Sequence, residues 1–63
     1  MMEEIATIQF QEIETSDQGL AVIRRSKDAV AIALSLQGNG DIEAVMTKED
    51  ARRLLKALQA AVE

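Results

Sequence analysis

A chain of 63 residues lies close to the lower limit for a domain that folds without help. It contains no cysteine and no histidine, so it forms no disulfide and lacks the usual ligands of zinc and other transition metals. The same absence excludes Ser-His-Asp and Cys-His catalytic arrangements. We therefore expect a single α+β domain over residues 1–63, without a cofactor, metal site or catalytic residue, that gains stability by binding a second copy of itself.

Composition and charge indicate an ordinary folded protein. Hydrophobic residues make up 48% of the chain and charged residues 29%, with a net charge of −4. The longest apolar run, Ala29–Leu34, is far too short to cross a bilayer. The first residues, MMEEIATIQF, are acidic where a secretory signal is basic. We expect a cytoplasmic protein with no membrane contact.

The first apolar segment, Ala6–Glu14, predicts a strand with an irregularity. Ile8 and Phe10 fall on one parity and Ile13 on the other, so the alternation slips by one residue between Phe10 and Ile13. A β-bulge near Gln11 accounts for this shift, and the register of the strand is otherwise open.

Two turns flank the second expected strand, Leu20–Arg25. Thr15–Gly19, with the sequence TSDQG, predicts a hairpin loop in which Gly19 takes a positive φ. Arg25–Asp28 is a weaker turn signal without glycine.

The third segment, Ala29–Gln37, alternates at period two. Its aliphatic residues face one way and its alanines the other, which favours a strand over the helix that its alanine and leucine content would permit. Gly38–Asp41, with the sequence GNGD, then predicts a primed turn with Asn39 and Gly40 at its centre. Ile42–Thr47 is the fourth expected strand.

The last segment predicts an amphipathic helix. Thr47 is placed to cap it, and Asp50 follows three residues later in a capping-box position. Glu49 lies four residues before Arg53, the spacing of an intrahelical ion pair. The apolar residues recur at helical spacing and form one stripe: Ala51, Leu54, Leu55, Leu58, Ala61 and Val62.

Short connections predict a four-stranded antiparallel meander followed by a C-terminal helix packed on one sheet face, a ββββα order. The helix should cover the face that carries Val30, Ile32, Leu34, Leu36, Ile42 and Met46. The opposite face would then be built from small and weakly polar residues, where a sheet face that meets water normally carries longer polar side chains. The candidate interface residues are Ala21, Ile23, Ala29, Ala31, Ala33, Ser35 and Val45.

Three interpretations of that uncovered face remain open. In the first, it packs on a second copy in a homodimer. In the second, it stays exposed to water, and in the third it binds a different protein or an exchanged helix or strand. Size, acidity and the lack of catalytic side chains favour a small non-enzymatic interaction or regulatory protein. In this hypothesis it acts as a homodimer through protein–protein contacts.

The alternative hypothesis is a binder of single-stranded nucleic acid. The ββββα order is similar to the units of the Whirly and purine-rich-element-binding families, and this resemblance implies single-strand binding on a sheet face and pairing into dimers. The candidate nucleic-acid contacts are Arg24, Arg25 and Lys27. Phe10 is the only aromatic residue, however, and single-strand binders stack bases on several. Pairing of this basic cluster with the acidic first strand is the plainer interpretation.

Overall fold

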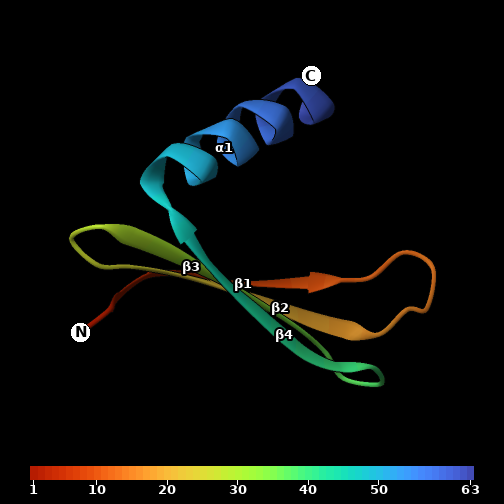
Figure 1. The fold of residues 1–63 in the computed structure, drawn as a ribbon. Coiled ribbons are helices and arrows are strands. Elements are labelled where there is room, and N and C mark those ends of the chain that lie inside the picture. The colour runs from red at the N-terminus through yellow and green to blue at the C-terminus, as the bar shows by residue number, and fades with distance from the viewer.

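Residues 1–63 are described by a computed structural model, which contains one sheet and one helix (Figure 1). The strands follow one another across the sheet in the order β1-β2-β3-β4, and each neighbouring pair is antiparallel. The predicted ββββα meander is therefore confirmed. The elements are β1 (Glu3–Gln11), β2 (Gln18–Arg25), β3 (Ala29–Leu36), β4 (Gly40–Thr47) and α1 (Lys48–Val62).

The bulge in β1 lies elsewhere than predicted. The register shifts between Glu4 and Ala6, whereas Gln11 is a regular partner of Gln18 at the end of the strand. The parity break at Ile13 marks the point where the chain has already left the sheet. A strand end and a bulge disturb the alternation in the same way, and the sequence does not distinguish them.

The carboxylate of Glu12 organises the loop between β1 and β2. It accepts hydrogen bonds from the backbone N–H groups of Glu14 and Thr15, each at 3.1 Å. Ser16 takes the left-handed conformation at φ 64° that was predicted for Gly19. Gly19 instead lies buried inside β2, where an added Cβ would collide with the ring of Phe10.

The turn between β3 and β4 also differs from the prediction. Gln37 and Gly38 occupy its centre, and it is closed by a 3.0 Å hydrogen bond from the N–H of Asn39 to the carbonyl of Leu36. Only Gly40 has a positive φ, at 84°. A type I′ turn needs positive φ at both central residues and a type II′ turn at the first. Neither Gln37 nor Gly38 has a positive φ, so this is not a primed turn.

The register divides the sheet residues into two faces, because directly paired residues point to the same side. Val30 pairs with Met46, Ile32 with Ile23, and Leu34 with both Ala21 and Ile42. We call this the helix-side face. Glu3 and Arg25 lie on it at the Val30 end, and its apolar members are Ala6, Ile8, Phe10, Ala21, Ile23, Val30, Ile32, Leu34, Leu36, Ile42, Ala44 and Met46. The outer face comprises Thr7, Gln9, Leu20, Val22, Arg24, Ala29, Ala31, Ala33, Ser35, Asp41, Glu43 and Val45.

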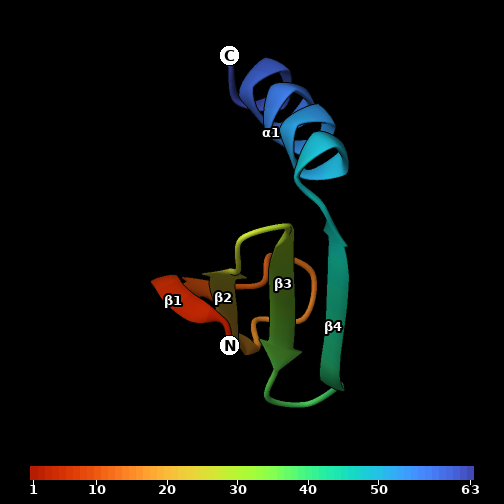
Figure 2. The ribbon, with the colours of Figure 1, turned by 60° about the vertical axis from the view of Figure 1, so that its left-hand side comes forward.

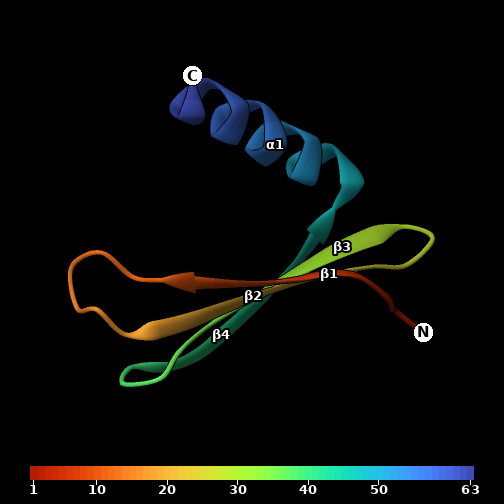
Figure 3. The ribbon, with the colours of Figure 1, turned by 180° about the vertical axis from the view of Figure 1, so that it is seen from behind.

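The helix begins directly after β4. The Thr47 hydroxyl caps it by accepting the N–H of Asp50 at 3.1 Å, as predicted. The helix packs against β3 and β4 through its first turns, where Ala51 and Leu55 lie near Val30 on the helix-side face. No residue separates strand from helix, so the extended backbone of Thr47 alone sets the helix direction. The C-terminal end of α1 consequently rises away from the sheet (Figures 2 and 3).

Candidate protein interface

An ion pair crosses the outer face above the alanines of β3. Arg24 on β2 and Glu43 on β4 meet at 2.9 Å, although a whole strand separates them. Arg24 is the cross-strand partner of Ala31, and Glu43 is the partner of Ala33. Larger side chains at these two positions would stand in the path of the bridge. The alanines are small because charged side chains pass over them, and Ala31 is only 1% exposed.

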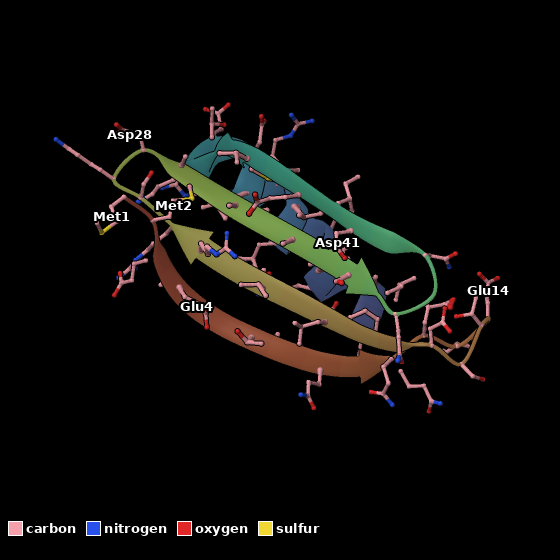
Figure 4. All side chains as sticks on the ribbon, turned by 90° about the horizontal axis from the view of Figure 1, so that it is seen from below. Met1, Met2, Glu4, Glu14, Asp28 and Asp41 are labelled. Atoms are coloured by element: carbon pink, nitrogen blue, oxygen red, sulfur yellow. The ribbon has the colours of Figure 1, made fainter.

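The outer face therefore carries paired polar side chains, as a sheet face in contact with water does, and is not a bare surface of small residues (Figure 4, viewed from this side with α1 behind the sheet). Ser35 donates a hydrogen bond to the Asp41 carboxylate on the neighbouring strand. The Thr7 hydroxyl donates to Glu4 at 2.8 Å. The alanines that the sequence isolates as a small-residue face thus have charged cross-strand neighbours, Arg24 and Glu43, as well as the apolar neighbours Val22 and Val45.

The predicted interface set does not lie on one face. Ala29, Ala31, Ala33, Ser35 and Val45 share the outer face. Ala21 and Ile23 were expected beside them, but they pair with Leu34 and Ile32 and lie on the helix-side face. Their placement was wrong because the start of β2 could not be fixed without its partner strand, and a shift of one residue exchanges the two faces.

The helix-side face is apolar except for the Arg25–Glu3 ion pair at its Val30 end, and α1 covers only that end of it. Ile42 is 68% exposed and Leu34 44% exposed. Near the β3–β4 turn these residues border a hollow of about 400 Å³ together with Phe10 and Leu36. The sequence predicted a helix covering this face, and the structure shows that the cover extends only to the Val30 end.

The apolar stripe of the helix is uncovered as well. Leu54 is 39% exposed, Leu58 55% and Val62 81%, so exposure rises as the helix leaves the sheet. No residue of α1 is buried. Figure 1 shows that α1 diverges from the sheet toward the C-terminus of the chain. We call the exposed stripe and the exposed part of the helix-side face together the apolar wedge.

The size of the uncovered surface can be compared with that of ordinary monomers. A folded monomer of 6.9 kDa exposes about 4,000 Å² by the general scaling with mass, whereas this chain exposes 5165 Å². Its radius of gyration is 12.6 Å, against about 11 Å for a compact chain of this length. About 1,200 Å² of extra surface per chain exceeds the ~800 Å² per partner that standard interfaces bury.

Two of the three candidate nucleic-acid contacts are engaged within the sheet. Arg25 pairs with Glu3 of β1 at 3.1 Å, as the predicted pairing with the acidic first strand requires. Arg24 pairs instead with Glu43 of β4 and lies on the opposite face from Arg25. Lys27, in the turn after β2, forms no ion pair within the chain. The structure thus gathers no basic patch from these three residues.

Two smaller predictions are resolved by side-chain geometry. Arg53 pairs with Asp50 at 3.5 Å, one turn away, and not with Glu49. The first strand, expected over Ala6–Glu14, ends at Gln11, so Glu12 and Glu14 lie in the loop after β1. The Glu12 carboxylate holds that loop together, so its role is structural.

Phe10 was not singled out by sequence reasoning, yet it forms one wall of the hollow. Its position opposite Gly19 in the β1–β2 register was the available signal, since an aromatic ring often lies over a cross-strand glycine. That signal becomes useful only once the register is known.

No protein-family model matches the chain, and neither a curated protein nor a solved structure shows significant similarity to it. The single helix is too short and too polar to cross a membrane.

Proposed function

We propose that this chain is a small non-enzymatic protein that acts through protein–protein contacts as a cytoplasmic homodimer. The observation that carries the proposal is the apolar wedge of α1 and the helix-side face. A chain with one buried hydrophobic residue has little core of its own. Because it contains no cysteine and no histidine, neither a disulfide nor a zinc site stabilises it in place of a core.

The uncovered surface also favours a permanent interface over a transient one. Two copies that each bury about 1,200 Å² remove about 2,400 Å² in total, which lies in the range of obligate homodimers. Such interfaces resemble a domain core divided in two, and both walls of the wedge have this apolar character.

The test is molar mass by light scattering over a wide concentration range, with a chemical unfolding curve at each concentration. We expect a mass near twice 6.9 kDa and a midpoint that rises with protein concentration. A folded species that stays monomeric at all concentrations would exclude the homodimer. Binding of a single-stranded oligonucleotide at low salt, lost at high salt, would favour the nucleic-acid alternative instead.

A further inference from the structure

The helix and the β1–β2 loop carry opposite charges that no contact within the chain neutralises. Lys48, Arg52 and Lys56 recur every four residues and form a basic row along one border of the apolar stripe. Glu14 and Asp17 lie in the loop, where Glu12 adds a third carboxylate. Neither group takes part in any ion pair of the structure.

One chain cannot bring these two groups together, because they lie at opposite ends of the sheet. The helix starts where Thr47 pairs with Ala29, beside the β2–β3 turn. The acidic loop leaves the sheet at the pair of Gln11 and Gln18, beside the β3–β4 turn. The loop nevertheless bends toward the side of the sheet on which the helix lies (Figures 1 and 3).

We propose that a second copy docks in the wedge with its helix antiparallel to α1, so that the basic row of each helix lies beside the acidic β1–β2 loop of the other copy. This inference rests on the homodimer proposed above and adds its geometry. A two-fold axis makes each contact twice, as an isologous interface requires. The reverse orientation would place Glu63 and the negative end of the helix dipole against the acidic loop.

The dimensions of the two walls agree with this arrangement. A helix of 15 residues is about 22 Å long, and a strand of 8 residues is about 26 Å long. A helix from the second copy therefore spans most of the helix-side face. The partner's Leu54 and Leu58 would then cover the hollow bordered by Phe10, Leu34 and Ile42.

Charge reversal tests the arrangement directly. Arg52→Glu reverses the helix and Glu14→Lys reverses the loop, and both side chains are exposed. Each variant alone brings like charges together twice per dimer, so we expect the dimer to dissociate about tenfold more readily at low salt. Mixed together, the two variants restore both contacts and should form the heterodimer in preference to either homodimer, as measured by native mass spectrometry.

The matched control is Arg53→Glu, which changes the same charge on the side of the helix away from the apolar stripe and should leave dissociation within about twofold of the unaltered protein. Circular dichroism checks that each variant is folded, and Lys56→Glu replaces Arg52→Glu if that variant is not. A stable dimer that neither reversal weakens, with no preference for the heterodimer, would overturn this geometry while leaving the homodimer intact. An unaltered protein that is monomeric would remove both proposals.

Discussion

Leu58→Ala tests whether the apolar stripe of α1 is an interface. Leu58 lies in the middle of the stripe and is 55% exposed in a single chain. Alanine is the best helix former, so the substitution removes apolar side-chain atoms without weakening the helix itself.

The expected magnitude differs sharply between a monomer and a dimer. Complete burial of a leucine contributes about 1.5–3 kcal/mol, so a side chain that is more than half exposed loses at most about 1 kcal/mol on truncation. In the proposed dimer each Leu58 would be enclosed by the other copy, and truncation of an enclosed leucine costs about 2–5 kcal/mol. With two such sites per dimer we expect a loss of about 4 kcal/mol, or roughly a 1,000-fold increase in the dissociation constant.

Sedimentation equilibrium gives the dissociation constant, and urea unfolding at two protein concentrations gives the stability of the folded state. Arg53→Ala is the matched control, because it truncates an exposed side chain on the side of the helix away from the apolar stripe. If Leu58→Ala lowers stability by less than about 1 kcal/mol and leaves the dissociation constant unchanged, the stripe does not contact a second copy.

Three further predictions concern the single chain. Ala31→Leu should destabilise the fold by about 1–3 kcal/mol in urea unfolding, because Ala31 is 1% exposed beneath the Arg24–Glu43 pair; unchanged stability would show that the space above it is free. Gly40→Ala should cost about 1–2 kcal/mol in thermal unfolding, since φ is 84° and an added Cβ meets no other atom; a neutral effect would argue against the left-handed conformation. Thr47→Ala should cost about 1 kcal/mol and lower helix content by circular dichroism, whereas Thr47→Ser should preserve both, and equal losses in the two variants would mean that the hydroxyl is not the cap.

The sequence alone determined the order of the elements and the position of the helix. Period-two alternation over Ala29–Leu36 and the capped apolar stripe after Thr47 are local signals, and each depends only on residues a few positions apart. The expectation of a partner also came from the composition alone, because size and the absence of cysteine and histidine do not depend on the fold.

The tertiary structure decided which apolar surface is left exposed. The alanines of β3 suggested an uncovered face, but a charged pair from β2 and β4 passes over them. A residue's environment in a sheet comes from strands that lie beside it in space and may be distant in sequence. The register therefore moved Ala21 and Ile23 to the opposite face.

The sequence likewise did not predict the tilt of the helix relative to the sheet. An amphipathic stripe predicts that a helix packs on something, and it does not specify whether that surface belongs to the same chain. Here the direct step from β4 to α1 allows only the first turns to reach the sheet. The remaining apolar surface of both elements is left open because the backbone at Thr47 directs the helix away from the strands that it would otherwise cover.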